Sequence, residues 1–147
     1  MSAERNGFDE VAVGDVISAG PREVPGAEIV TYAKRYDPRP YHVSDLAGRE
    51  SHFGGLVASG THTLSLWNEL RFEAEAGLDE LAGVGLDEVR YPRPVRPGDR
   101  LSLRAECIAK QLSQSKPDRG TLTFRHEISN QNGELVLSLL VQTIVAR

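Results

Sequence analysis

The chain has 147 residues, of which 39% are hydrophobic and 26% charged, with a formal net charge of −4 at pH 7. This length and composition predict one globular domain over residues 1–147, and the acidic balance argues against a nucleic-acid-binding protein. No apolar run approaches the roughly 20 residues that a membrane helix needs. The first residues lack the apolar stretch of a signal peptide, so we expect a cytoplasmic protein. The single cysteine, Cys107, excludes an intramolecular disulfide and is typical of a small core residue.

Basic residues gather in one part of this acidic chain. Residues 90–125 carry nine basic side chains and three acidic ones. Such a segment either binds a phosphate-bearing small ligand or forms the outward, solvated faces of strands. The sequence leaves both interpretations open.

The first half of the chain predicts one strand and one short helix before an irregular segment. Val13–Ala19 is expected to be a short strand, followed by turns at Pro21 and Pro25. Apolar residues at helical spacing predict a helix over Ala27–Tyr36, which the following prolines prevent from continuing. Residues 37–58 show no clear period, and a structureless segment of this length is usually functional.

A second and longer helix follows the irregular segment. Ser59 or Thr61 can cap its start, and Gly77 can close it in the left-handed conformation. Its apolar residues recur at helical spacing and form one stripe, which consists of Thr63, Leu66, Trp67, Leu70 and Ala74. This stripe makes it the expected core helix, and Trp67 is expected to be an ordinary core residue.

The remaining residues predict antiparallel strands. Val84–Tyr91 is one strand, and alternating apolar residues predict two more over residues 101–109 and 122–128. Asn132-Gly133 is typical of a type I′ hairpin, and Leu135–Val145 is apolar enough for an interior strand. We therefore expect an α+β fold, with an antiparallel sheet of about five strands curled around one long helix.

The irregular segment holds residues suited to acid–base chemistry. Asp37 and His42 stand five positions apart with Pro38 and Pro40 between them, and prolines reduce the entropy lost on fixing two side chains. Aspartate and histidine are the usual groups for proton transfer near neutral pH. The alternative is an Asp-Pro turn with an incidental histidine.

Glycines lead into the core helix. Phe53, Gly54 and Gly55 precede Ser59-Gly60, and glycine lets a ligand approach the backbone closely. Free N–H groups of a first helical turn can stabilise an anion or an oxyanion. The glycine pair could also be a simple tight turn.

Together these segments resemble the MaoC-like dehydratase family of hotdog-fold proteins, which is related to (R)-specific enoyl-CoA hydratases. The resemblance covers roughly residues 30–140 in order, and its most specific element is Asp-x-x-Pro-x-His; it is carried by DPRPYH, FGGLVASGTHT, VRYPRPVRPGD and NQNGE.

The resemblance implies a lyase that adds water to trans-2-enoyl thioesters or removes it from 3-hydroxyacyl thioesters. Asp37 and His42 would activate the water, and the Gly60 N–H would hold the thioester oxygen. The expected partner is an acyl-CoA or acyl-carrier-protein thioester, with no cofactor, metal, nucleic acid or membrane. The family further implies a homodimer or higher homo-oligomer.

Two positions depart from the family pattern. Arg39 stands where the hydratases commonly have asparagine, and it could point outward, toward an acyl carboxylate or toward a CoA phosphate. Ser59 replaces the histidine that many relatives have before the glycine. With Phe53 and Gly55, these two residues make up the expected substrate-binding set.

Other functions remain as alternatives. A hotdog thioesterase would use a carboxylate on the core helix, for which Glu69 and Glu73 are the candidates. The second alternative is a non-catalytic subunit of a heteromeric dehydratase. The presence of both Asp37 and His42 argues against it. His42, His52 and His62 recur every ten residues, which is not the spacing of a zinc site.

Overall fold

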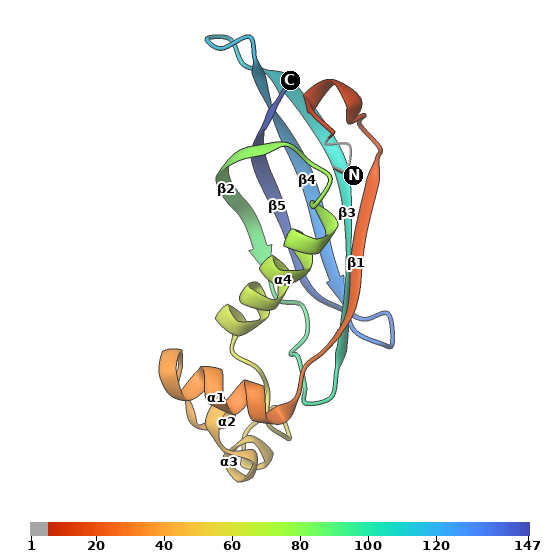
Figure 1. The fold of residues 1–147 in the computed structure, drawn as a ribbon. Coiled ribbons are helices and arrows are strands. Elements are labelled where there is room, and N and C mark those ends of the chain that lie inside the picture. The colour runs from red at the N-terminus through yellow and green to blue at the C-terminus, as the bar shows by residue number, and fades with distance from the viewer. Residues whose placement is uncertain (1–5) are drawn as a thin grey trace.

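A computed structural model of the protein describes residues 6–147, in which a five-stranded sheet curls around one long helix. The sheet order is β1-β3-β4-β5-β2, and every pairing is antiparallel. The long helix α4 (Gly60–Ala74) crosses the concave face, and three shorter helices gather beyond one end of the sheet (Figure 1). Among the described helices none is both long and apolar enough to span a membrane. This architecture confirms the predicted α+β class.

The three interior strands provide most of the core. They are β3 (Arg100–Leu112), β4 (Arg119–Ser129) and β5 (Leu135–Ala146). The predicted alternation is confirmed for β4 and for residues 101–107 of β3, whose apolar positions face inward while Arg104 and Arg125 are exposed. It is wrong at Ala109, which is exposed because the register of β3 with β4 shifts between Cys107 and Ala109. Arg100, Arg104 and Arg125 lie on solvated outward faces, whereas Lys110 and Arg119 are half-buried.

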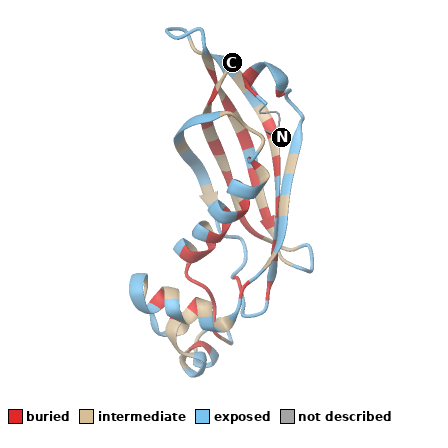
Figure 2. Ribbon diagram, in the orientation of Figure 1, coloured by how far each residue is buried: buried red, intermediate tan, exposed pale blue. Residues whose placement is uncertain are grey.

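Helix α4 covers the inner face with the predicted stripe. Leu66, Trp67 and Leu70 are buried against the sheet (Figure 2). The expected left-handed stop at Gly77 is wrong, because the helix already ends at Ala74 and the Glu75 N–H donates to the Arg71 carbonyl. Gly77 then lies in the turn that leads to β2.

The first strand differs from the prediction. Strand β1 spans Val16–Glu23 instead of Val13–Ala19, and it continues through Pro21. Its register with β3 shifts between Ala19 and Arg22, where Gly20 has a φ of 102°. A proline is tolerated here because β1 is an edge strand and the bulge interrupts the hydrogen-bond ladder.

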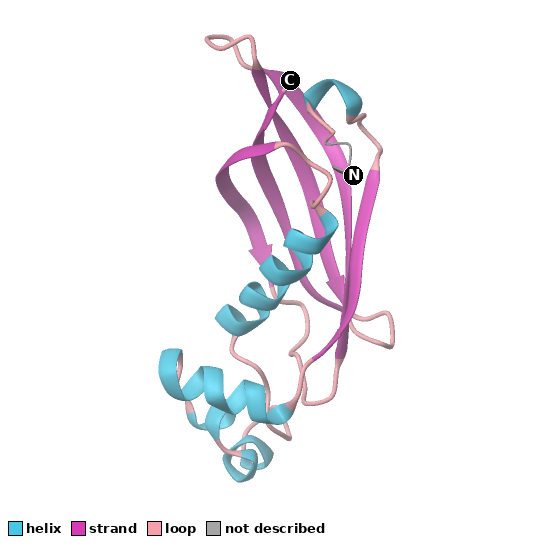
Figure 3. Ribbon diagram, in the orientation of Figure 1, coloured by secondary structure: helices cyan, strands magenta, loops and turns pink. Residues whose placement is uncertain are grey.

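The segment expected to lack structure contains two short helices, α2 (Pro40–Val43) and α3 (Asp45–Glu50) (Figure 3). Pro40 is the first residue of α2, where a missing N–H costs no intrahelical hydrogen bond. The Ser44 hydroxyl accepts from the Ala47 N–H and so caps α3. Capping thus stabilises helices too short to show a hydrophobic period.

The hairpin between β4 and β5 is not the predicted type I′ turn. A type I′ turn needs two consecutive residues with positive φ, but only Gly133 has one, at 73°. The Gly133 N–H donates to the Asn130 carbonyl, and the Asn130 side chain accepts from the Glu134 N–H. The hydrogen bonds of Asn130 therefore stabilise this turn, and a second residue with positive φ is not needed.

Strand β2 (Glu80–Arg90) begins earlier than predicted and lies at the other edge of the sheet. It is exposed along most of its length (Figure 2), including the apolar side chains of Leu81, Val84 and Leu86. An apolar edge strand offers unpaired backbone groups to another strand.

Polar side chains are buried beneath the C-terminal end of α4. The Trp67 indole N–H donates to Nδ1 of His126 at 2.9 Å, and Nε2 of His126 lies 3.8 Å from a carboxylate oxygen of Glu75. Arg71 donates to the other Glu75 oxygen at 2.9 Å. Burial raises the pKa of Glu75 to about 7, against the pull of Arg71, and burial lowers the pKa of His126 to about 3.

Replacing Glu75 by glutamine should change how stability depends on pH. The folded protein keeps a proton on Glu75 that the unfolded chain releases near pH 4.5, so the stability contributed by this group is lost as the pH rises from 4.5 to 7. The stability of the wild type relative to Glu75→Gln should therefore fall by up to about 3 kcal/mol across this range. Denaturant unfolding at a series of pH values measures the difference.

Glu73→Gln serves as the control, because Glu73 is exposed near the end of α4, and it should leave the pH dependence of the unfolding free energy unaltered. A constant difference between wild type and Glu75→Gln from pH 4.5 to 7 would contradict the assignment.

Candidate active site

The predicted acid–base residues lie where α1 (Gly26–Tyr36) ends, beside the N-terminal end of α4. The predicted helix over Ala27–Tyr36 is confirmed with one residue added. Asp37 follows its last turn and donates its N–H to the Ala33 carbonyl. Helix α2 then returns the chain, so that His42 faces Asp37. The proline-rich corner therefore brings the two side chains together.

The geometry fixes the tautomer of His42. Its ring is buried, and Nδ1 lies 2.7 Å from the Val57 carbonyl oxygen. A carbonyl can only accept, so Nδ1 carries the proton and Nε2 of the neutral ring is an acceptor. Nε2 faces Oδ2 of Asp37 at 3.6 Å, which is too long for a direct hydrogen bond.

An aromatic cluster supports the imidazole of His42. The Tyr41 ring meets it edge-on with centroids 4.6 Å apart, and Phe53 lies 5.2 Å from Tyr41 on the other side. The Phe53 carbonyl accepts a hydrogen bond from Arg96 at 2.8 Å, which ties this loop to the segment before β3. Among residues 6–147, Phe53 therefore contacts Tyr41 and His52 through its ring and has no hydrogen bond with Asp37.

Gly55 has a packing role in the same loop. A Cβ atom on Gly48 would lie 2.5 Å from the Gly55 carbonyl carbon, so the two backbones touch. This contact holds the strand-like segment that carries Val57, whose carbonyl orients His42. The structure therefore brings Asp37, Arg39, His42 and Ser59 into direct contact, while Phe53 and Gly55 build the wall around them.

Both oxygens of the Asp37 carboxylate are engaged. The Ser59 hydroxyl donates to Oδ2 at 2.7 Å, and Arg39 donates to Oδ1. The hydrogen bond from Ser59 lowers the pKa of Asp37 most, burial opposes it, and the positive charge of Arg39 lowers it further. Ser59 occupies the N-cap position of α4, yet its hydroxyl serves Asp37 instead of the helix.

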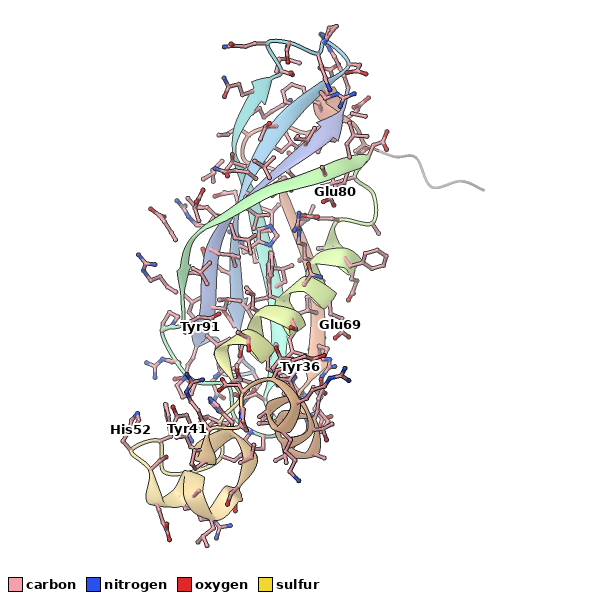
Figure 4. The ribbon with its side chains drawn as sticks, turned by 90° about the vertical axis from the view of Figure 1, so that its left-hand side faces the viewer. Tyr36, Tyr41, His52, Glu69, Glu80 and Tyr91 are labelled. Atoms are coloured by element: carbon pink, nitrogen blue, oxygen red, sulfur yellow. The ribbon has the colours of Figure 1, made fainter. Side chains whose placement is uncertain are left out.

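Gly60 is the first residue of α4, so its N–H has no intrahelical acceptor. The Tyr91 ring covers its α-carbon, and a Cβ at residue 60 would lie 3.3 Å from Cζ of that ring. Figure 4 shows Tyr91 level with Glu69, in the lower half of the molecule that also holds Tyr36 and Tyr41. Tyr91 was not among the predicted site residues, and its one signal was its place at the end of a strand before a proline.

The other candidates lie away from this corner. Glu69 is exposed and pairs with Arg22 at 3.3 Å, and His52 is exposed beside Phe53. His62 is buried, stacks on Tyr32 at 4.5 Å and approaches Glu28 at 3.3 Å; burial lowers its pKa. Within residues 6–147, no group of three or more metal-binding side chains is arranged to hold an ion.

The corner therefore offers three chemical functions where α1 and α2 meet the start of α4. An ionised carboxylate and a neutral imidazole nitrogen are two acceptors that can share one donor molecule. The first turn of α4 offers a backbone donor at the positive end of the helix dipole. These groups suit proton transfer next to a carbonyl whose oxygen gains negative charge.

An antiparallel sheet curled around one long helix defines a protein of the hotdog fold. The model of the MaoC like domain matches residues 10–127. The chain belongs to the MaoC-like dehydratase family, and the resemblance in the sequence is confirmed.

Known proteins are similar over nearly the whole chain. The crystal structure of a MaoC-like dehydratase from Rhodospirillum rubrum superposes with a TM-score of 0.89 and 35% identity, covering 97% of each chain. The protein YdeM of Bacillus subtilis, described as uncharacterized, is 29% identical and covers 95% of this chain and 99% of its own. The mesaconyl-CoA hydratase of Cereibacter sphaeroides is 30% identical over 95% of this chain, which spans only 41% of that enzyme.

Removing the Ser59 hydroxyl should raise the pKa of Asp37. The hydroxyl is the main group that stabilises the ionised carboxylate, so Ser59→Ala makes the carboxylate easier to protonate. We expect the pKa of Asp37 to move upward, which NMR titration of the labelled aspartate side chains measures.

Ser65→Ala is a matched control, because that hydroxyl bonds the Thr61 carbonyl on the exposed side of the same helix. If the carboxyl of Asp37 titrates identically in the wild type and in Ser59→Ala, the hydrogen bond does not have the effect assigned to it.

Proposed function

We propose that the protein catalyses the (R)-specific hydration of trans-2-enoyl thioesters, or the reverse dehydration of 3-hydroxyacyl thioesters. The observation that carries this proposal is the pair of acceptors, Asp37 Oδ2 and His42 Nε2, that face each other at 3.6 Å beside the free N–H of Gly60. Membership of the MaoC-like family supports it.

A water molecule is the donor that this pair selects. Its two O–H groups donate to Asp37 Oδ2 and to His42 Nε2, which leaves an oxygen lone pair free to attack. Because the Val57 carbonyl fixes Nδ1 as the protonated nitrogen, Nε2 is already in the state that can receive a proton. The water is thus positioned and activated by groups that need no rearrangement.

The proton route follows from the relative basicity of the two acceptors. Ser59 and Arg39 lower the pKa of Asp37, so the carboxylate orients the water and is the poorer base. As the water oxygen bonds to C3 of the substrate, one water proton passes to Nε2 of His42. The C2–C3 π electrons move toward the thioester, and His42 then gives the proton to C2, which restores the neutral ring and completes the addition of water.

The Gly60 N–H would stabilise the intermediate charge. During attack at C3, negative charge develops on the thioester oxygen, and a backbone donor at a helix N-terminus is suited to bind it. One such donor is worth about 10²–10³-fold in rate in known enzymes. Tyr91 shields this end of α4 from solvent on the side of the Gly60 α-carbon.

The relatives point to the same reaction class. The mesaconyl-CoA hydratase is an enzyme that adds water to a CoA thioester, according to its name, and this chain matches a part of it. A thioesterase finds less support, because its candidate Glu69 is exposed on α4 and is paired with Arg22.

Loss of either acceptor should abolish most of the turnover. Asp37→Asn removes the charge that orients the water, and His42→Gln removes the base, so kcat for hydration of crotonyl-CoA should fall about 10²–10⁴-fold in each. The loss of absorbance of the conjugated double bond measures the rate, and the unfolding midpoint verifies that each variant is folded.

His52→Gln is the matched control, since His52 is an exposed histidine beside Phe53 and away from Asp37, and the variant should keep the wild-type rate. Near wild-type hydration by either Asp37→Asn or His42→Gln would exclude the mechanism. Release of free CoA thiol with the double bond intact would favour the thioesterase instead.

We also propose that two copies pair through β2. This edge strand exposes Leu81, Val84 and Leu86, and apolar edge strands are usually covered in the functional assembly. Sheet extension across two antiparallel β2 strands would bury these side chains and satisfy the free backbone groups at once.

A charge on this edge should separate the copies. Val84→Arg places a cation in the middle of the proposed contact and should shift the sedimentation coefficient of the wild type from dimer to monomer. Val16→Arg, at an exposed valine on the opposite edge strand β1, should leave the assembly unchanged. A dimer that survives Val84→Arg but not Val16→Arg would place the contact on β1.

A further inference from the structure

Arg39 is a guanidinium left largely open to solvent beside the reacting groups. It directly precedes α2, donates one N–H of Nη1 to Oδ1 of Asp37, and has a side chain that is 62% exposed. Among residues 6–147 its guanidinium has no other hydrogen bond or ion pair. A guanidinium has five N–H groups, so four of them stand ready for another acceptor.

The two oxygens of Asp37 divide the site into two sides. Ser59 donates to Oδ2, the oxygen that also faces His42, whereas Arg39 donates to Oδ1. Gly60 directly follows Ser59, so the backbone donor for the thioester oxygen belongs to the Oδ2 side. Arg39 therefore approaches the carboxylate from a different side than the thioester group does.

This division gives the bound substrate a direction, and this step rests on the proposed function. With the thioester oxygen at Gly60 and C3 at the water shared by Asp37 and His42, the rest of the acyl chain extends away from Gly60. The substituent on C3 then comes to lie next to Arg39.

The charge of that region favours an anion. Lys34 and Arg35 occupy the last turn of α1, immediately before the corner, and add positive potential to that of Arg39. A planar guanidinium fits a carboxylate through two parallel hydrogen bonds. An alkyl chain in the same place would strip water from the guanidinium without replacing its hydrogen bonds, which is unfavourable.

We propose that Arg39 is a specificity-determining residue that selects thioesters whose acyl group carries a carboxylate on C3, that is, monothioesters of trans-butenedioic acids. The carboxylate of the substrate accepts from the free N–H groups of Arg39, while Nη1 keeps its bond to Asp37. The phosphates of CoA offer similar chemistry, so the test compares ligands that share CoA and differ only in the acyl group.

The test uses fumaryl-CoA, which has the required carboxylate, and crotonyl-CoA, which has a methyl group in its place. The wild type should show a kcat/KM for fumaryl-CoA at least about tenfold above that for crotonyl-CoA, and Arg39→Gln should lower this ratio about 10²-fold, as expected when a charged acceptor loses its partner. Because Arg39 also contacts Asp37, both rates fall in the variant, and the ratio isolates the contact with the acyl group. Arg49→Gln removes an exposed arginine of α3 that pairs with Asp45 and not with Asp37, and it should leave the ratio within about twofold.

A binding measurement separates this inference from the proposed reaction. Succinyl-CoA and butyryl-CoA lack the double bond and cannot be hydrated. Calorimetry should show that Arg39→Gln weakens the binding of succinyl-CoA and leaves the binding of butyryl-CoA unchanged. Equal weakening of the binding of both ligands would assign Arg39 to the CoA phosphates and overturn the inference. Equal kcat/KM values of the wild type for crotonyl-CoA and fumaryl-CoA would also overturn it, but would leave the proposed hydratase activity intact. Discrimination in binding without hydration of either thioester would support Arg39 and reject the proposed function.

Discussion

The hydrogen bond from the Ser59 hydroxyl to Asp37 joins the two parts of the chain on which the site depends. Asp37 ends α1, and Ser59 begins α4, so this 2.7 Å contact fixes the distance between the carboxylate and the first amide of the core helix. A serine at an N-cap position usually bonds the backbone of its own helix, and here that bond is given up. The N-terminal amides of α4 are correspondingly freer to bind an anion.

The histidine is oriented by the backbone and not by the carboxylate. In many acid–base pairs an aspartate holds the protonated ring nitrogen, but the Val57 carbonyl takes that role for His42. Asp37 is thereby released to face the other nitrogen across 3.6 Å. Packing of Gly48 against Gly55 holds the segment that carries Val57, so a tight backbone contact next to the site determines which ring nitrogen faces the Val57 carbonyl.

Sequence periodicity predicted the elements in which buried and exposed residues alternate regularly. It failed for elements that are stabilised by backbone groups and caps. Helix α1 and strands β3 and β4 were predicted because one face of each is apolar. Helices α2 and α3 are held by a proline and a serine cap, which leave no period. Asp37, His42 and Gly60 could be named from residue type and motif, whereas the Val57 carbonyl carries no side-chain signal and Tyr91 reaches Gly60 from 31 positions away.

Arg39 links the chemistry of the site to the choice of substrate. Its charge lowers the pKa of Asp37, which weakens that carboxylate as a base and, in the proposed reaction, leaves proton transfer to His42. A substrate carboxylate bound at Arg39 would offset part of this charge and raise the basicity of Asp37 at the moment of binding. A neutral acyl group would not, so binding of the matching substrate would itself adjust the carboxylate that holds the attacking water. Substrate recognition and water activation would then share a single guanidinium.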